Sequence, residues 1–414
     1  MDLQIPKYDI IENDQGKAVI SPGNYMSVFI KRNGFFARWK EFKSTEIENS
    51  LAVDFNYFIY NGLFESLQDL INLISYLGKS EEFFAGDPEF CPFGPEILDI
   101  EVSTICHGVN GKPCNFCYKA NTGSGENMTI DQFKTILKKV SKSRTLSQLA
   151  LGVGDIDSNP DLWKMMEFCR EINIVPNITI NGWNLTDEYA QNLKRLCGAV
   201  AVSNYGSDIC YNAVQKLTDL GMDQINIHQI VSLESLDQCF QVIKDSKSDS
   251  RLSKLNAIVF LMLKPKKRGK TVKRLTSLKK YSELIDFALE QKVRIGFDSC
   301  SAISFLRAVR GKPEYKSFVE MAEPCESTLF STYINVFGEF APCSFCEGEK
   351  GWTEGISVLE CDDFLKDVWY NPRVIKFREK LLETTHKEHL SCPVFDLDLV
   401  EESEPVPILT GEIT

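Results

Sequence analysis

The chain has 414 residues, of which 43% are hydrophobic and 25% charged, so it can bury the core of a main domain with one or two smaller attachments. Its 46 basic and 58 acidic residues give a formal charge of -12, which argues against a nucleic-acid partner because a phosphate backbone favours a basic surface. No run approaches the ~18 apolar residues of a membrane span and no signal peptide is visible, so we expect a cytoplasmic protein without a membrane partner.

Residues 1–95 are expected to form a small N-terminal α/β module. The segment 25–42 has alternating apolar positions on both sides of Asn33-Gly34, which is a strong hairpin signal. Residues 63–77 have apolar side chains at helical spacing, so a helix is predicted there.

From residue 97 the pattern changes to strands that alternate with helices. The predicted strand and helix pairs are 97–105 with 128–140, 146–154 with 160–172, 175–181 with 187–197, 198–204 with 210–221, 222–232 with 236–245, and 254–263 with 278–292. The strands are continuously apolar, as in a parallel sheet that helices cover. We therefore expect an α/β fold with a partial (β/α)6 TIM-like barrel over 96–297, and a doubly wound open sheet is the alternative.

After the strand-like segment 292–300 the alternation stops. Residues 298–398 are expected to form a small C-terminal domain, with a hairpin at 329–343 and a final helix at 371–383, followed by an acidic tail at 399–414. Residues 264–280 contain nine Lys and Arg residues. They form either a solvated loop and helix face or a basic surface that attracts an acidic peptide.

Three cysteines, Cys106, Cys114 and Cys117, directly follow the first predicted barrel strand. Ligands bind at the carboxyl ends of strands in parallel α/β proteins. A structural zinc site would need a fourth ligand, and His107 is awkwardly placed for it because it is adjacent to Cys106. Three thiolates on one loop suit a 4Fe-4S cluster with one iron left open.

With Phe116 before the last cysteine, this loop resembles the motif of radical S-adenosylmethionine (radical SAM) enzymes, although the first two cysteines are separated by seven residues rather than the usual three. The resemblance implies an oxidoreductase that cleaves S-adenosylmethionine to a 5′-deoxyadenosyl radical and takes its electron from a flavodoxin or ferredoxin. It also implies cofactor contacts at strand ends, from Gly152, Gly154, Asp155, Ser203, Asn204 and His228. A satisfied core histidine is an equal alternative for His228.

The second set of cysteines resembles the opening of the SPASM and twitch domains, which carry auxiliary Fe-S clusters. The resemblance implies one auxiliary 4Fe-4S cluster with four ligands, Cys300, Cys325, Cys343 and Cys392. Cys346 is the alternative to Cys300, and otherwise a free thiol that could act in catalysis. Asp298 is a candidate proton acceptor, with a solvated strand-end carboxylate as the alternative.

The implied function is a peptide maturase, an enzyme that modifies a peptide or protein substrate. The N-terminal module would then recognise the peptide by strand addition. The alternatives are modification of a small molecule such as a sugar or nucleoside, with the module as a buttress, and a non-catalytic Fe-S redox sensor.

Overall fold

The structure, a computed structural model, describes residues 9–12, 16–21, 25–30, 35–39, 90–91, 94–143, 145–146, 148–172, 174–322, 325–385, 392–395 and 397–401. The predicted helix at 63–77 and most of the predicted tail lie outside these residues. Within the described part of the chain, no helix has the length and apolar character that crossing a membrane requires.

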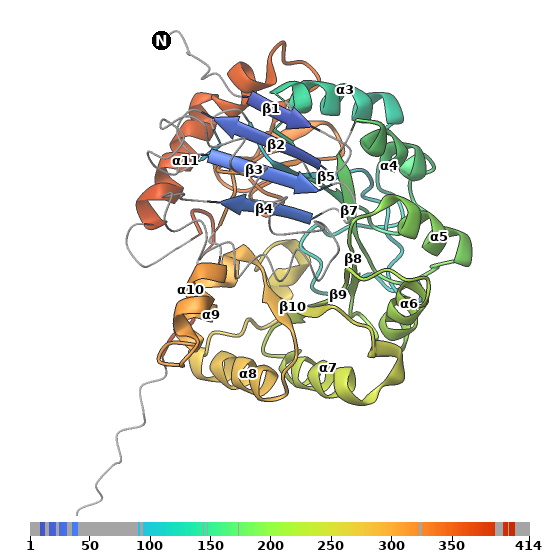
Figure 1. Cartoon of the computed structure of the whole chain (residues 1–414), viewed down its shortest axis with the longest axis vertical. Coiled ribbons are helices and arrows are strands. Elements are labelled where there is room, and N and C mark those ends of the chain that lie inside the picture. Colours follow the sequence, from blue (N-terminus) through green and yellow to red (C-terminus); the bar gives the residue numbers. More distant parts are fainter. Residues whose placement is uncertain are drawn as a thin grey trace, which may run out of the picture.

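The N-terminal strands form a four-stranded antiparallel sheet, drawn in blue in Figure 1. Its strands are β1 (Asp9–Glu12), β2 (Gly16–Ser21), β3 (Tyr25–Ile30) and β4 (Phe35–Trp39). Ile30 pairs with Phe35, so the predicted hairpin between β3 and β4 is present. The strands β1 and β2 were not predicted.

Seven parallel strands form the main sheet in chain order, from β5 to β11. They are β5 (Ile97–Glu101), β6 (Gln148–Gly152), β7 (Val175–Ile180), β8 (Val200–Ser203), β9 (Ile225–Val231), β10 (Ala257–Met262) and β11 (Ile295–Phe297). A doubly wound sheet would reverse its strand order at a switch point, whereas this order runs in one direction. The expected partial barrel is therefore confirmed, and the doubly wound alternative is wrong.

Helices follow the strands and surround the outside of the sheet in Figure 1. They are α3 (Ile130–Val140), α4 (Leu162–Glu171), α5 (Asp187–Leu196), α6 (Ser207–Asp219), α7 (Leu236–Ser248) and α8 (Leu278–Glu290). Local sequence sets their ends: Thr129 accepts a hydrogen bond from the Gln132 backbone, and the Gln132 side chain accepts one from Thr129, which is a capping box. Short 3₁₀ segments lie at Ser141–Ser143, Ser250–Leu252, Lys267–Thr271 and Ser299–Ser301.

The C-terminal segment extends the main sheet beyond β5. The strands β12 (Ser331–Ile334), β13 (Glu339–Ala341) and β14 (Ile356–Ser357) continue it, with β12 parallel to β5 and β13 antiparallel to β12. The predicted hairpin is thus present, but its pairing with the first barrel strand was not foreseen. The remaining helices are α9 (Ala302–Ala308), α10 (Tyr315–Met321), a π-helix at Phe364–Trp369 and α11 (Pro372–Thr385).

Side chains of the barrel strands point alternately outward into the core and inward into the barrel. In β5, Leu98 and Ile100 are buried, whereas Asp99 is exposed on the opposite face of the strand. Successive side chains of a strand point to opposite faces of the sheet, so Asp99 and Glu101 point into the barrel. The outward side chains pack under the helices and form the core.

Candidate functional site

A cavity of about 470 Å³ lies inside the barrel, where the loops after the strands meet. The loop after β5 and the carboxyl ends of β6 to β11 line it, and the C-terminal segment adds Tyr333, Ser344 and Phe345. This is the end of a parallel sheet at which ligands are expected to bind.

Cys106, Cys114 and Cys117 all line this cavity as free cysteines. The hydroxyl of Tyr205 interacts electrostatically with all three thiols, so they converge on one region of the wall. Burial raises the pKa of Cys106 to about 12 and that of Cys114 to about 11. The thiols of Cys106 and Cys114 are therefore protonated at neutral pH in the absence of a metal, and metal binding would deprotonate them.

The geometry argues against the zinc alternative. Among the described residues, no group of three His, Cys, Asp or Glu side chains is arranged to hold a single metal ion. The His107 side chain is 64% exposed, and its Nδ1 lies 2.9 Å from Asp155 Oδ2. A four-iron cluster takes each thiolate on a different iron, so its ligands lie farther apart than those of one ion, which fits three free cysteines that share one region of a cavity wall.

Close packing fixes the cysteine loop against β6. A Cβ on Gly154 would lie 2.0 Å from the Ile105 carbonyl oxygen and 2.6 Å from Cys106 Cβ, so a side chain has no room at this position. Asp155 Oδ2 accepts a hydrogen bond of 2.7 Å from the His107 backbone, and Asp155 Oδ1 lies 3.6 Å from Cys106 Sγ. The end of β6 therefore sets where Cys106 sits.

The segment after β10 holds the other end of the loop. Arg268 Nε donates to the Cys114 carbonyl oxygen at 2.8 Å, and Nη2 donates to the Asn121 carbonyl oxygen at 3.0 Å. The ring of Phe116 lies against that of Tyr205 with centroids 5.0 Å apart. Arg268 belongs to the basic segment 264–280, so part of that segment faces the loop instead of solvent.

Two further lysines of the segment also point inward. Lys264 forms an ion pair with Asp298, and both line the cavity. Lys266 is 1% exposed and donates to the carbonyl oxygens of Ser344 and Phe345. Asp298 is therefore paired rather than the solvated carboxylate considered as its alternative, and its role as proton acceptor stays a prediction.

The structure divides the predicted cofactor residues into two groups. Gly152, Gly154, Ser203 and His228 line the cavity with the cysteines. Burial lowers the pKa of His228 to about 4, although Asp298 acts in the opposite direction, so this imidazole is neutral near pH 7.

Asp155 and Asn204 do not line the same cavity. Asp155 is 3% exposed and accepts from Asn181 Nδ2 at 3.0 Å in addition to the His107 backbone. Asn204 Nδ2 donates to Gln229 Oε1 at 2.8 Å. Their expected cofactor contacts stay predictions, and for Asp155 the structure adds contacts that hold the cysteine loop.

Sequence reasoning missed a polar network at the floor of the cavity. Lys119 Nζ lies 3.1 Å from Glu101 Oε2, donates to Tyr333 Oη at 2.7 Å, and forms an ion pair with Glu347. Burial raises the pKa of Glu101, although Lys119 opposes the shift. The signal in the sequence was the polar residues at alternate positions of the segment 97–101, which place acidic side chains on the inner face of a strand.

The second cysteine set also gathers in space. Cys325 interacts electrostatically with Cys300, Cys343 and Cys392, and Cys300 interacts with Cys343 and Cys392. Cys346 Sγ lies 3.3 Å from Cys343 Sγ, and this hydrogen bond lowers the pKa of Cys343. All five thiols are thus neighbours, including both candidates for the fourth ligand.

Cys361 lies apart from this group. Its thiol donates to the Val358 carbonyl oxygen at 3.2 Å.

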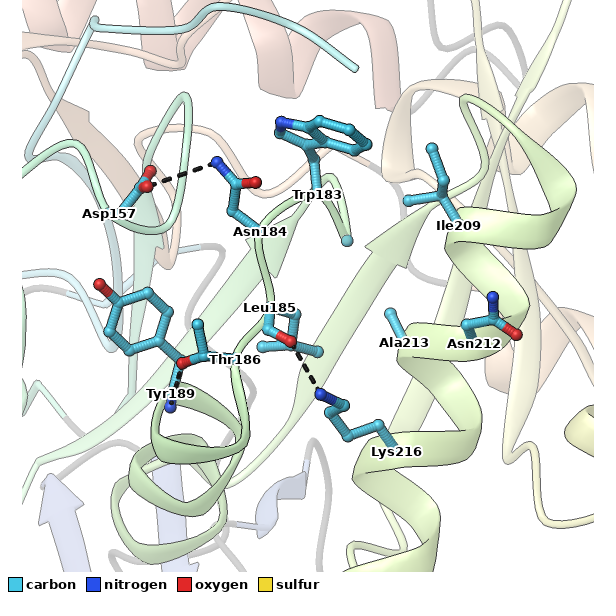
Figure 2. A pocket seen from close by; sticks show the side chains of 11 residues that line it. Asp157, Trp183, Asn184, Leu185, Thr186, Tyr189, Ile209, Asn212, Ala213 and Lys216 are labelled. Atoms are coloured by element: carbon cyan, nitrogen blue, oxygen red, sulfur yellow. Dashed lines mark hydrogen bonds between the residues drawn. The ribbon is translucent and has the colours of Figure 1, made fainter. Parts of the chain in front are cut away.

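A second cavity, of about 530 Å³, lies outside the barrel between α5 and α6 (Figure 2). Polar side chains of this cavity have partners in the protein: Asn184 Nδ2 lies 3.5 Å from Asp157 Oδ2, and Lys216 donates to the Leu185 backbone carbonyl oxygen at 3.0 Å. None of its lining residues is a cysteine or one of the predicted cofactor residues.

No protein-family model and no curated protein matches this chain by sequence. Solved structures match its fold. Streptococcus suis SuiB matches with a TM-score of 0.58 and 14% identity over 89% of this chain and 90% of SuiB. SuiB bound to precursor peptide SuiA matches with a TM-score of 0.58 and 16% identity over 89% of this chain and 88% of that one. Native anSMEcpe with bound AdoMet and Kp18Cys peptide matches with a TM-score of 0.50 and 16% identity, over 73% of this chain and 93% of anSMEcpe. The fold that the resemblance to radical SAM enzymes implied is confirmed by these structures.

Proposed function

We propose that this chain is a radical SAM enzyme that binds a 4Fe-4S cluster and S-adenosylmethionine in the barrel cavity and modifies a peptide or protein substrate. The observation that carries the proposal is the convergence of Cys106, Cys114 and Cys117 on one cavity wall, within a fold that matches SuiB over nearly the whole of both chains. The fit is good, because the three thiols are free and share the cavity with the predicted strand-end residues.

When bound, the cluster would supply the electron that cleaves S-adenosylmethionine to methionine and a 5′-deoxyadenosyl radical, which takes a hydrogen atom from the substrate. The chain's own residues position the cysteine loop and shield the cavity from water. Gly154 and Arg268 hold the loop from two sides. The neutral His228 can accept or donate a hydrogen bond without repelling a sulfonium cation. Apolar wall residues such as Ile180 and Leu261 exclude water, which protects a reactive radical from side reactions.

An auxiliary cluster is part of the proposal. The proximity of Cys300, Cys325, Cys343 and Cys392 supports it, and the contact with Cys346 lowers the pKa of Cys343, which suits Cys343 as a thiolate ligand. We therefore keep Cys300 as the fourth ligand.

A peptide substrate is favoured over a small molecule by two features. SuiB, which shares the fold, has been solved with a precursor peptide. Among the described residues, β1 and β4 are the outer strands of the N-terminal sheet, and the outer strand of a sheet can pair with an extended peptide as an additional strand.

The first experiment measures 5′-deoxyadenosine formation by anaerobically reconstituted, reduced protein. Wild type should hold about eight irons and cleave S-adenosylmethionine, whereas the triple variant Cys106→Ala/Cys114→Ala/Cys117→Ala should hold about four and cleave none. The control is Cys361→Ala, since this thiol lies apart from both sets. Cleavage by the triple variant would sink the proposal, and an iron-loaded wild type without cleavage would favour the redox sensor.

The second experiment identifies the substrate class. Short peptides encoded beside the gene are incubated with the active protein and followed by mass spectrometry, and sugars and nucleosides are treated in parallel. A mass change in a peptide that requires S-adenosylmethionine supports the peptide maturase. A change in a sugar or nucleoside alone would replace it with the small-molecule alternative.

A further inference from the structure

The charged side chains that line the barrel cavity are almost all paired. These side chains are Asp99, Glu101, Lys119, Lys264, Arg268 and Asp298. Lys119 pairs with Glu101 at 3.1 Å, and Lys264 pairs with Asp298. Arg268 uses its guanidinium on two backbone carbonyls of the cysteine loop.

Asp99 is the exception. Within the described part of the chain, its carboxylate has neither a hydrogen bond nor an ion pair. Asp99 lies deep in the molecule, yet its side chain is exposed, because the surface that it presents is the cavity wall. Burial raises its pKa to about 6, and no opposing cation limits the shift.

The polar groups around Asp99 have other partners. The Tyr118 hydroxyl interacts electrostatically with both Glu101 and Asp99, but it donates its own hydrogen bond to Ser344 Oγ at 3.2 Å. The residue opposite Asp99 on β6 is Ala150, which is too small to fill the space and has no polar group to offer. The residue opposite Asp99 on β12 is Tyr333, whose hydroxyl accepts from Lys119 and donates to Glu101. Among the described residues, the Asp99 carboxylate therefore has no donor.

The depth of Asp99 separates it from the expected cofactor site. The cysteines come after β5 ends, and Gly152 and Gly154 are at and beyond the end of β6, whereas Asp99 lies inside β5, two residues before Glu101. A group that reaches Asp99 must pass the level of the cysteine loop and enter the floor of the cavity. Tyr333, Ser344 and Phe345 of the C-terminal segment also line the cavity.

We propose that Asp99 binds a positively charged group of the substrate, an ammonium or a guanidinium, at the floor of the barrel cavity. A carboxylate on the wall of a deep cavity has few water molecules around it, and a cation that enters the cavity can form an ion pair with it that is stronger than a pair in bulk water. For a peptide substrate, this group would be a lysine or arginine side chain or the terminal amine. The inference rests on the proposed function in taking the cavity as the substrate site.

The test measures binding of three fluorinated probes to the reconstituted full chain saturated with S-adenosylmethionine, by fluorine NMR under anaerobic conditions. The probes are 4-fluorobenzylammonium, 4-fluorobenzylguanidinium and the neutral 4-fluorobenzyl alcohol. At least one cation should bind about tenfold more tightly than the alcohol, and which cation binds distinguishes an ammonium from a guanidinium site. In Asp99→Asn this preference should disappear, and Asp99→Glu should retain part of it.

The matched control is Asp157→Asn, which removes a carboxylate from the outer cavity of Figure 2 and should keep the preference. Equal affinity of wild type for cations and alcohol, or an unchanged preference in Asp99→Asn, overturns the inference. So does loss of S-adenosylmethionine binding in Asp99→Asn, which would assign Asp99 to the cofactor. If wild type binds cations through Asp99 but never cleaves S-adenosylmethionine, the proposed function fails and the cation site stands.

Discussion

Asp99 and His228 both lie on inward faces of barrel strands, and burial shifts the pKa of each so that its neutral form is favoured. The pKa of Asp99 is raised to about 6 and that of His228 is lowered to about 4. At pH 7 the Asp99 side chain is therefore ionised, which lowers the stability of the fold, and the His228 side chain is uncharged. Such residues are common at functional sites, where stability is given up for chemistry.

The first prediction at the residue scale concerns the stability of Asp99→Asn. The folded-state pKa of Asp99 is raised from 3.8, so its contribution to stability is greatest below pH 3.8 and is lost as the pH rises through about 6. Asp99→Asn should therefore be more stable than wild type near pH 8, by about 1 kcal/mol after allowance for cavity water. Anaerobic urea denaturation at about pH 8 and about pH 5.5 measures this, and the difference should shrink at the lower pH. A variant less stable than wild type near pH 8 would contradict it.

The second prediction separates the two candidates for the fourth auxiliary ligand. Cys300→Ala should reduce the iron content from about eight to about four, because the auxiliary cluster would lack one of its four thiolate ligands and dissociate. Cys346→Ala should keep about eight irons, because in our proposal Cys346 lies beside the cluster ligand Cys343 at 3.3 Å without being a ligand itself. Iron analysis after anaerobic reconstitution is the measurement, and the opposite pattern would assign the ligand to Cys346.

At the scale of elements, the functional loop depends on the strand ends beside it. The loop after β5 contacts the end of β6 through Gly154 and the segment after β10 through Arg268. Neighbouring strands in a parallel sheet end at one edge, so loops distant in sequence support one another.

The third prediction tests this support with Gly154→Ala. The added Cβ would overlap the Ile105 carbonyl oxygen at 2.0 Å, so the loop must move and displace Cys106. We expect about four irons instead of about eight and a loss of about 2 kcal/mol in unfolding free energy. Gly206→Ala is the control, because among the described residues no atom lies within 4 Å of its added Cβ. Full iron content in Gly154→Ala would show that the loop adapts.

At the scale of the whole molecule, the barrel and the C-terminal segment form one structure. The strand β12 pairs with β5, and Lys266 from the segment after β10 donates to the backbone carbonyls of Ser344 and Phe345. These carbonyls lie between Cys343 and Cys346, so one buried lysine connects the barrel to the second cysteine set.

The fourth prediction concerns that connection. Lys266→Met removes a charged donor and leaves buried carbonyls without it, which should lower the unfolding free energy by about 2–3 kcal/mol. Limited proteolysis should then cut the C-terminal segment faster, and its cluster should be lost first. The control is Lys270→Met, because Lys270 belongs to the same segment and is exposed. Equal proteolysis of the two variants would mean that Lys266 is not required for docking.

The sequence by itself determined the elements that depend on local pattern. Apolar runs and caps such as Thr129 predicted the order of strands and helices, because neighbouring residues decide whether a strand or helix forms. Alternation with helices predicted the parallel barrel, and the spacing of Cys106, Cys114 and Cys117 identified the loop that lines the cavity.

Only the tertiary structure decided which side chains meet. Asp155 binds the His107 backbone, β12 joins β5, and Lys266 turns inward to a segment about eighty residues away. Asp99 has no partner among the described residues for the same reason: its neighbours come from other strands and from the C-terminal segment. Charge pairing in a barrel depends on which distant segments close the cavity, and a local pattern carries no information about that choice.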